Sequence, residues 1–345
     1  MRAGLERLIR DAFRDLDATG IGVVDVGSRE GLQPVFDEIA PLVDAVGFEP
    51  DADECRRLNR DVGAAKRYRS LTFLPFGLGS EGMFRPLHLC RSRGTSSLSR
   101  PNRAFLDRFP EPERFDVERE VGVPVRAFDG MTADPTLRLP ERIDFVKVDT
   151  QGSELDVLRG ARKTLCEQVV AVEVEIEFAQ LYESSVLFRD VDAYLAECGF
   201  TLFKLRRLEW VRRTLGVKTE ASAGQVVFGD ALYLRDPLNP RTPWLPRDRH
   251  QAEALVLMAI LYDLHDFAWE VVSSSAIEAM VDADAIRRYI AERCRRLGPQ
   301  WSRVRTFREL ASAVRAAARR VVRFRRYEPT WSRGDAAFYS RLGTR

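Results

Sequence analysis

The residues best able to do chemistry begin in a stretch that follows a run of β-branched residues. This stretch is Asp25-Val26-Gly27-Ser28-Arg29-Glu30-Gly31. A strand, a glycine turn and a helix in this order form a cofactor cradle, because backbone N–H groups at the turn can face a ligand. We therefore expect a strand over residues 21–26, a turn at Gly27 with free N–H groups, and a helix that opens near Gly31.

A second strand is expected over residues 43–48, and it closes in Phe48-Glu49-Pro50. Glu49 follows Gly31 at close to the ~20-residue interval at which an acidic residue meets a ribose in such folds. A dinucleotide site prefers G-x-G-x-x-G, with a second glycine so that the backbone can approach a pyrophosphate. No glycine occupies that position here. An adenosyl ligand without phosphates does not need one, and both kinds of ligand remain open on these residues.

A third stretch makes the pattern more specific. A strand expected over residues 143–149 contains Lys147 and ends at Asp149, and Gly152 and Glu154 follow. Helix capping can explain Asp149 and Glu154, and a turn can explain Gly152. Capping does not explain a lysine in a buried strand, so these residues are interpreted as part of a site.

These stretches resemble the FkbM family of S-adenosylmethionine-dependent methyltransferases. That family shows Asp-Val-Gly-Ala-Asn-x-Gly, a strand closing in Phe-Glu-Pro, and Lys-x-Asp-x-x-Gly-x-Glu followed by Leu and Arg-Gly-Ala. The chain matches the last motif through Leu155, Leu158 and residues 159–161, and it also carries a Ser-Ser-Leu stretch and Pro101-Asn102, as several relatives do. It departs from the family at Ser28-Arg29, where hydrogen bonds are expected to differ.

The resemblance implies S-adenosylmethionine as cofactor and a hydroxyl of a glycan or secondary metabolite as acceptor. Asp149 is the first candidate for the acid–base or metal-binding carboxylate, and His88 is the second candidate for a base. A divalent ion is possible at Asp149, Glu154 and Glu173, but no ligand spacing requires one. The cofactor contacts expected are Asp25, Gly27, Ser28, Gly31, Glu49, Pro50, Gly77 and Leu78, and the acceptor-side residues expected are Ser96, Ser97, Lys147, Glu154 and Glu173.

The alternation of strand and helix patterns predicts an α/β fold of the class I methyltransferase, Rossmann-like type. We expect a doubly wound, seven-stranded, mostly parallel sheet whose final hairpin makes one strand antiparallel. Residues 71–78 and 169–176 are among the expected strands, and residues 79–120 are expected to form a functional insertion with short hairpins. Glutamates alternate with apolar residues in the strand over 169–176; Glu173 is expected to point into the cleft, with Glu175 as the lesser alternative.

Three regions follow from the composition along the chain. Residues 1–236 are expected to be the methyltransferase domain, residues 237–246 a proline-rich linker, and residues 247–345 an all-helical extension of open role. An amphipathic helix is expected over 253–272, and Ser275/Glu278 and Thr306/Glu309 have capping-box spacing. A basic run over 315–326 is typical of a solvated face, and less often of a surface for a partner. Homo-oligomerisation or a partner bound through this helical C-terminus is possible.

Composition excludes several classes of protein. The chain has 345 residues, of which 45% are hydrophobic and 31% charged, and its net charge is +2. These values are typical of a soluble globular protein and argue against a dedicated nucleic-acid binder. Five cysteines without C-x-x-C spacing predict neither a zinc site nor a disulfide framework. With no signal-peptide core and no membrane span in the sequence, we expect a cytoplasmic protein. The alternatives are a nicotinamide-dependent oxidoreductase and a non-catalytic binding module built on a methyltransferase scaffold.

Overall fold

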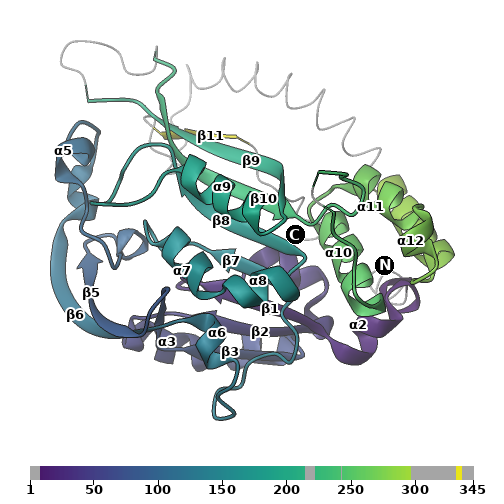
Figure 1. Ribbon diagram of the computed structural model, residues 1–345. Helices are drawn as coiled ribbons and strands as arrows, with labels where there is room; N and C mark the ends of the chain where they lie inside the picture. The colour runs from purple at the N-terminus through teal and green to yellow at the C-terminus, as the bar shows by residue number, and fades with distance from the viewer. Residues whose placement is uncertain (1–7, 214–221, 242, 297–331, 336–345) are drawn as a thin grey trace, which may run out of the picture.

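The computed structural model describes residues 8–213, 222–241, 243–296 and 332–335. Its centre is a sheet with the order β11-β9-β10-β8-β7-β1-β2-β3 (Figure 1). Strands β3, β2, β1, β7 and β8 pair in parallel, whereas β10 runs antiparallel to β8 and β9. The bounds are β1 (Ile21–Val26), β2 (Val43–Phe48), β3 (Ser70–Leu74), β7 (Phe145–Val148), β8 (Ala171–Glu177), β9 (Thr201–Trp210), β10 (Gln225–Leu234) and β11 (Ser332–Gly334). The predicted seven-stranded, mostly parallel sheet is confirmed, and β11 adds a short eighth strand.

The central parallel strands β1, β2, β7 and β8 are buried on both faces, as their continuous apolar runs predict. In β1, Ile21 and Val23 belong to one core, and Val24 and Val26 to the other. The second core packs under helices that lie on the near face in Figure 1. These are α6 (Phe128–Met131), α7 (Glu154–Gly160), α8 (Arg162–Glu167) and α9 (Phe188–Glu197).

The connection from β1 to β2 differs from the prediction. The helix expected to open near Gly31 is absent, and two 3₁₀ turns, η1 (Pro34–Glu38) and η2 (Ala40–Leu42), take its place. Pro34 lies in the first turn, where proline is tolerated, but Pro41 lacks the N–H group that a helix continuing to that point needs, and its ring would clash with the preceding turn. The helix after β2, by contrast, is α3 (Ala52–Asn59), and the Asp51 side chain caps it by accepting from the Asp53 N–H group. It leads to α4 (Val62–Arg67).

A second, three-stranded sheet with the order β4-β6-β5 lies beside the carboxyl ends of the main strands. Its strands are β4 (Gly77–Leu78), β5 (Met83–Cys90) and β6 (Val117–Arg126). The single strand expected over residues 71–78 is wrong, because the chain breaks at Pro75 and passes from β3 in one sheet to β4 in the other. The expected insertion contains η3 (Arg93–Thr95), α5 (Arg103–Leu106) and η4 (Pro112–Phe115) between β5 and β6.

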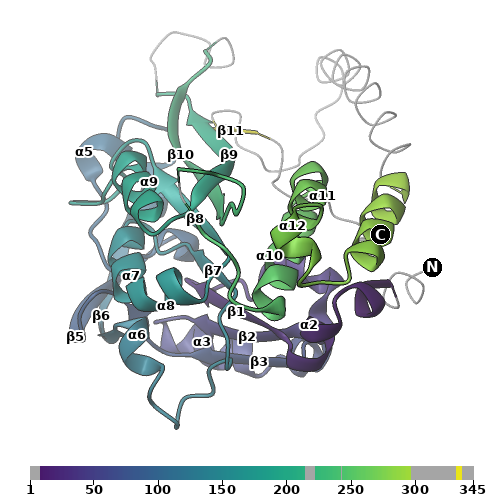
Figure 2. The same cartoon turned by 45° about the vertical axis from the view of Figure 1, so that its right-hand side comes forward.

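Helix α10 (Arg249–Leu261) is buried on every side rather than amphipathic. All residues from His250 to Leu261 are buried, and the apolar ones, Ala252 and residues 254–261, belong to the same core as Ile21 and Val23 of β1. A helix that is apolar all round belongs inside a protein. Figure 2 shows α10 beside α2 (Arg14–Thr19), with α11 (His265–Val272) and α12 (Ser275–Glu278) following it. The single helix expected over 253–272 is broken, because α10 ends before Asp263, whose φ is 61°.

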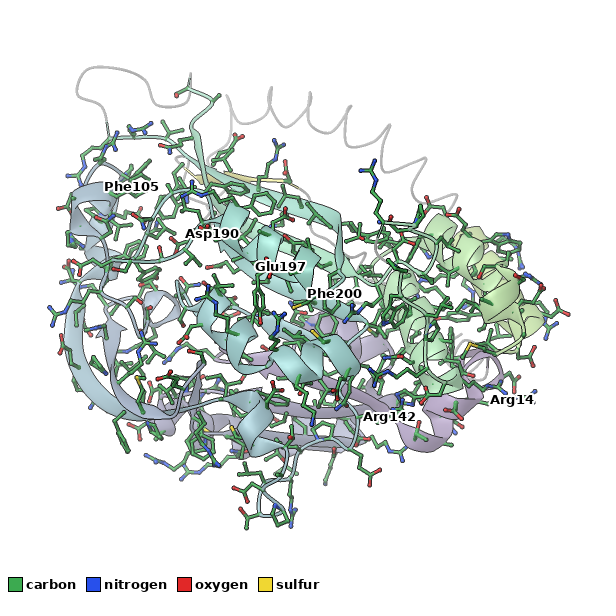
Figure 3. The ribbon with its side chains drawn as sticks, in the orientation of Figure 1. Arg14, Phe105, Arg142, Asp190, Glu197 and Phe200 are labelled. Carbon is green, nitrogen blue, oxygen red and sulfur yellow. The ribbon has the colours of Figure 1, made fainter. Side chains whose placement is uncertain are left out.

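Buried polar contacts fix α10 to the sheet and to α2. His250 Nε2 lies 2.9 Å from Asp144 Oδ1, next to the start of β7. Glu253 Oε2 accepts from the backbone N–H groups of Asp15 and Leu16, at 3.0 and 3.2 Å. On the surface, Arg142 (Figure 3) pairs with Asp248 at 2.7 Å. The domain boundary near residue 247 stays a prediction, while the core on this face of the sheet is shared across it.

The part of the chain after residue 296 is described only at 332–335. The expected Thr306/Glu309 capping box and the basic run over 315–326 lie outside the described residues. Within those residues, no helix has both the length and the apolar composition needed to cross a bilayer.

We predict that Leu257→Ala in α10 lowers the free energy of unfolding by about 2–5 kcal/mol, because Leu257 is fully buried and the substitution leaves a cavity. The same substitution at Leu245, whose side chain is exposed, is expected to change it by less than about 0.5 kcal/mol. Denaturant unfolding of both variants measures the difference. If the protein unfolds in a single transition whose midpoint Leu257→Ala does not change, α10 does not share a core with the sheet.

Candidate functional site

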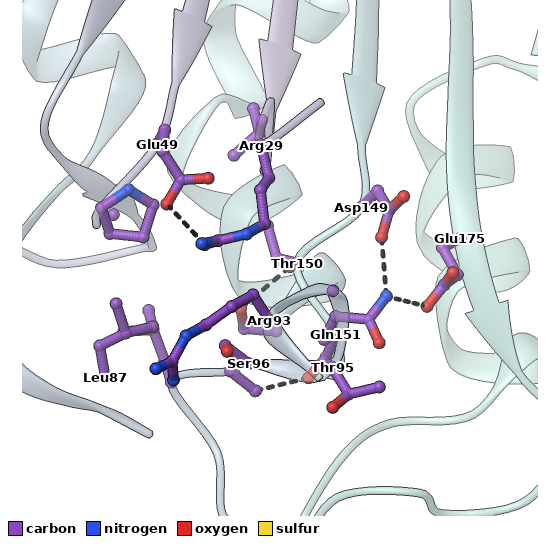
Figure 4. A pocket seen from close by; sticks show the side chains of 18 of the residues that line it. Arg29, Glu49, Leu87, Arg93, Thr95, Ser96, Asp149, Thr150, Gln151 and Glu175 are labelled. Carbon is purple, nitrogen blue, oxygen red and sulfur yellow. Dashed lines mark hydrogen bonds and ion pairs between the residues drawn. The ribbon is translucent and has the colours of Figure 1, made fainter. Parts of the chain in front are cut away.

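One cleft of about 810 Å³ runs along the carboxyl ends of the central strands. In the order of the sheet, it is lined by Glu49 after β2, Gly27 after β1, Asp149 after β7 and Glu175 on β8 (Figure 4). The second sheet and the η3 loop form its other wall, through Gly77, Leu78, Leu87 and residues 93–98. The cleft therefore lies where ligands bind in open α/β sheets, outside the carboxyl ends of the strands.

The turn at Gly27 needs a glycine. Its φ is 83°, and a Cβ atom there would lie 1.8 Å from the carbonyl oxygen of Asp149. The N–H groups of Gly27 and Ser28 are not free as expected, because both donate to the Phe48 carbonyl, at 3.0 and 3.2 Å. These two groups therefore tie β1 to β2 and are not available to a pyrophosphate.

Glu49 lies in the same cleft as Gly27, at the end of the next strand. Its Oε1 atom accepts from the Asp51 N–H at 2.8 Å, and Arg29 Nη1 lies 3.9 Å from the same oxygen. Burial raises the pKa of Glu49 to about 7, although these two partners oppose the rise. Arg29 also contacts Asp51 Oδ2 at 3.4 Å. The family departure at Arg29 thus places a guanidinium beside the carboxylate at this end of the cleft (Figure 4).

Two of the expected cofactor residues lie beneath the cleft rather than on its wall. Asp25 and Ser28 are both 1% exposed, and neither lines the cleft. The carboxylate oxygens of Asp25 and the hydroxyl of Ser28 have no hydrogen-bond partner among the described residues. Burial raises the pKa of Asp25 to about 6, against the opposing charge of Lys147. The other expected cofactor residues, Gly27, Gly31, Glu49, Pro50, Gly77 and Leu78, do line it.

Charged side chains form a row across one face of the sheet just below the cleft. The register aligns Asp25, Lys147 and Glu173 on β1, β7 and β8. Lys147 Nζ lies 3.7 Å from Asp25 Oδ1 and 3.3 Å from Asp149 Oδ2. The pKa of Lys147 is above its usual range, because these carboxylates and Glu173 outweigh the effect of burial. A buried lysine that capping could not explain is thus the counter-ion of the site.

The loop after β7 joins Asp149 to Glu175. Gln151 Nε2 donates to Asp149 Oδ1 at 2.9 Å and to Glu175 Oε1 at 2.7 Å (Figure 4). The Tyr182 hydroxyl lies 2.9 Å from Gln151 Oε1, which fixes the amide with its NH₂ towards the carboxylates. Gln151 has a φ of 59°, a conformation that side chains other than glycine rarely adopt. A strained residue held by three side chains is typical of a functional site.

Glu175, the lesser alternative, lines the cleft, and Glu173 does not. Glu173 Oε1 accepts from Gln33 at 2.6 Å, and Glu173 Oε2 accepts from the Tyr262 hydroxyl at 2.7 Å. Both glutamates point to the same face of β8, but Gln33 and Tyr262 cover the deeper one. The expectation that Glu173 points into the cleft is therefore wrong, and Glu175 occupies that position.

Glu154 and His88 also lie off the cleft. Glu154 Oε1 accepts from the N–H groups of Thr150 and Gly152, at 2.9 and 3.0 Å, so its carboxylate shapes the loop that carries Gln151. His88 is 2% exposed on β5, and its Nδ1 lies 3.1 Å from Glu120. The structure therefore gives Glu154 a loop-shaping position and separates His88 from the cleft.

Ser96, Ser97 and Lys147 line the cleft as expected. The Ser97 hydroxyl donates to the carbonyl of Gln151 at 2.5 Å, which joins the η3 loop to the loop after β7. Ser96 Oγ accepts from the Cys90 N–H at 3.1 Å. Among the described residues, no cluster of three His, Cys, Asp or Glu side chains could hold a metal ion.

Residues that the sequence did not indicate form the end of the cleft beyond Glu175. They are Arg114, Phe115, Leu181, Trp210 and Phe228. The Arg114 guanidinium lies 4.5 Å from the centre of the Trp210 ring and 4.9 Å from that of Phe115. Burial lowers the pKa of Arg114 to about 10. Gln151 could have been suspected from its place between Asp149 and Gly152. No local sequence pattern predicts the aromatic wall of the cleft, which Phe115, Trp210 and Phe228 form.

A sequence model described as the methyltransferase FkbM domain matches residues 25–202. This range includes the Gly27 turn, Glu49, Asp149 and Glu175, and it spans more than half of the chain. The chain belongs to the FkbM methyltransferase family. No curated protein sequence matches this FkbM methyltransferase.

Solved structures of methyltransferases are similar in fold. The FkbM methyltransferase from Methylobacillus flagellatus KT is 16% identical, with a TM-score of 0.33 over 63% of this chain and 44% of that one. The magnesium protoporphyrin IX methyltransferase of Synechocystis PCC 6803, solved with bound SAM, is 10% identical, with a TM-score of 0.31 over 68% and 79%. Sp1610 of Streptococcus pneumoniae, a putative tRNA (m1A22) methyltransferase, is 12% identical, with a TM-score of 0.31 over 80% and 97%. This chain thus spans less than half of the M. flagellatus protein.

We predict that Gly27→Ala abolishes binding of S-adenosylhomocysteine, because the new Cβ would push apart the ends of β1 and β7. It is also expected to destabilise the fold by more than about 1 kcal/mol, since φ is positive at this position. Calorimetric titration and thermal unfolding measure the two effects. Gly122→Ala on β6, where a Cβ meets no atom within 4 Å, is the matched control. Wild-type affinity in Gly27→Ala would contradict this account of the turn.

Proposed function

We propose that this protein is an S-adenosylmethionine-dependent O-methyltransferase whose acceptor is a hydroxyl of a glycan or secondary metabolite. One observation carries the proposal: the Gly27 turn and Glu49 line a single cleft together with Asp149. A nucleoside with its hydroxyls at Glu49 would lie next to the turn, and the acceptor would approach from the strands beyond it.

The residues present fit this cofactor. The carboxylate of Glu49 can accept hydrogen bonds from ribose hydroxyls, and Gly77 and Leu78 line the wall proposed for the adenine. The close approach at Gly27 leaves backbone rather than side chain at the centre of the cleft. Asp25 and Ser28 keep buried polar groups below the turn that have no hydrogen-bond partner in the described part of the chain, within the segment proposed for the methionine end. When bound, the cofactor supplies an electrophilic methyl group on a sulfonium sulfur.

The chain's own task is to orient an acceptor hydroxyl and to remove its proton. Carboxylates suit this task, and Asp149 and Glu175 both line the cleft. The nicotinamide alternative has little support, because the N–H groups of Gly27 and Ser28 are used by Phe48. The aromatic and apolar side chains beyond Glu175 suit a small organic acceptor.

We predict that S-adenosylhomocysteine binds more tightly as the pH rises from 6 to 8. The pKa of Glu49 is about 7 in the folded protein, so the ionised form, which accepts hydrogen bonds from the ribose more strongly, becomes populated across this range. Glu49→Gln is expected to weaken binding about 10- to 100-fold at pH 8 and to flatten the pH dependence, because the charge-assisted bonds are lost. Isothermal titration calorimetry at several pH values measures both effects.

The matched control is Glu81→Gln, because Glu81 is exposed and does not line the cleft. NADH, titrated under the same conditions, is expected not to bind. Tight NADH binding with no binding of S-adenosylhomocysteine would overturn the proposal.

Incubation with methyl-labelled S-adenosylmethionine and a set of glycans and hydroxylated metabolites tests the transfer itself. We expect label in an O-methyl ether of one of these acceptors. Cofactor binding with no methylated product from any acceptor would instead support the non-catalytic binding module.

A further inference from the structure

Glu175 lies one strand further from Glu49 than Asp149 does. The sheet places β2, β1, β7 and β8 side by side, so the cleft passes Glu49, Gly27, Asp149 and Glu175 in that order. With the nucleoside at Glu49 and the amino-acid part at Gly27, the acceptor would enter over β8. On that side Glu175 is followed by the aromatic wall that contains Trp210.

The two carboxylates differ in their partners. Asp149 is bound on both oxygens, since Lys147 Nζ lies 3.3 Å from Oδ2 and Gln151 Nε2 lies 2.9 Å from Oδ1. Glu175 accepts from Gln151 at 2.7 Å, and no cation pairs with it within 4 Å in the described part of the chain. Glu175 is thus the one of these two carboxylates without a neighbouring cation, and a carboxylate without a cation keeps its affinity for a proton.

Several carboxylates surround Glu175. Asp149 faces it from the loop after β7, and Asp230 lies opposite it on β10, paired with Arg206 at 3.4 Å. Glu154 at the start of α7 and Glu177 on β8 add further negative charge, and Lys147 is the cation of the neighbouring strand. Burial and these carboxylates raise the pKa of Glu175 well above its ordinary value.

We propose that Glu175 is the general base of the methyl transfer, and that Gln151 is its positioning residue. This inference rests on the function proposed above. The acceptor oxygen forms a bond to the methyl carbon while the carbon–sulfur bond breaks. The electron pair of the broken bond stays on the sulfur, so the sulfonium becomes a neutral thioether. The hydroxyl proton passes to the carboxylate of Glu175, so charge and atoms balance.

The proposal can be tested without the acceptor. A sulfonium beside Glu175 favours the ionised carboxylate and lowers its pKa, whereas the neutral thioether of S-adenosylhomocysteine does not. S-adenosylmethionine should therefore release more protons on binding than S-adenosylhomocysteine does. Calorimetry in buffers of different ionisation enthalpy counts these protons. The wild-type protein is expected to show the excess near neutral pH.

Two substitutions on one strand give a matched comparison. Glu175→Gln is expected to abolish the excess proton release while it still binds S-adenosylhomocysteine. Glu177→Gln is expected to retain the excess. Glu177 is also buried, and its pKa is raised to about 8, but it does not line the cleft, and its carboxylate accepts from the Ser185 hydroxyl and the Leu181 N–H. Gln151→Met removes a hydrogen bond to the ionised carboxylate, so the excess should move to higher pH.

The outcomes separate the two proposals. Failure of the wild-type protein to bind either ligand would overturn the proposed function. If both ligands bind, an excess that persists in Glu175→Gln, or that is absent from the wild-type protein, would overturn the role of Glu175. An excess unmoved in Gln151→Met would overturn the positioning role. If Glu175→Gln does not fold, the affinities of the wild-type protein for S-adenosylmethionine and S-adenosylhomocysteine are compared at several pH values. A ratio of the two affinities that does not change with pH would contradict a titrating base at Glu175.

Discussion

The ammonium of Lys147 is the interaction on which the site depends. It lies between Asp25 and Asp149, with Glu173 aligned on the next strand, in a region largely closed to solvent. Several carboxylates buried together would repel one another and lose their hydration, and one well-placed cation offsets part of that cost. Because the lysine is shared between β1 and β7, the same contact that balances charge also joins the two strands that meet at the Gly27 turn.

The row of charged side chains formed by Asp25, Lys147 and Glu173 begins where the segment that covers this face of the sheet ends. Towards the amino ends of the strands the face is apolar and packs against α10. Towards the carboxyl ends it becomes acidic, and α10 ends at that level, where the Tyr262 hydroxyl donates to Glu173. Tyr262 also stacks on Phe145 of β7, with ring centres 6.0 Å apart. A residue beyond the family match thus helps to build the floor of the cleft.

Local patterns predicted the strands, the glycine turn and Glu49, because each depends on a few neighbouring residues. Period-two alternation put Glu173 and Glu175 on one face of β8 but could not tell which of them is covered. That choice depends on Gln33 and Tyr262, which are far away in the sequence. The N–H groups of the Gly27 turn were mispredicted for a similar reason, since their acceptor is the Phe48 carbonyl at the end of the next strand.

The fully buried α10 also has a consequence for biosynthesis. The ribosome makes it after β1, β2, β7, β8 and β10, the strands whose apolar face it covers or adjoins. Until residues 249–261 emerge from the exit tunnel, that face lacks the cover that α10 provides, and the nascent chain presents the uncovered part to chaperones or to other nascent chains. The hydroxyl of Tyr262 arrives with the same segment. The buried contact between Tyr262 and Glu173 can therefore form only after α10 has been made, well after the glycine turn itself.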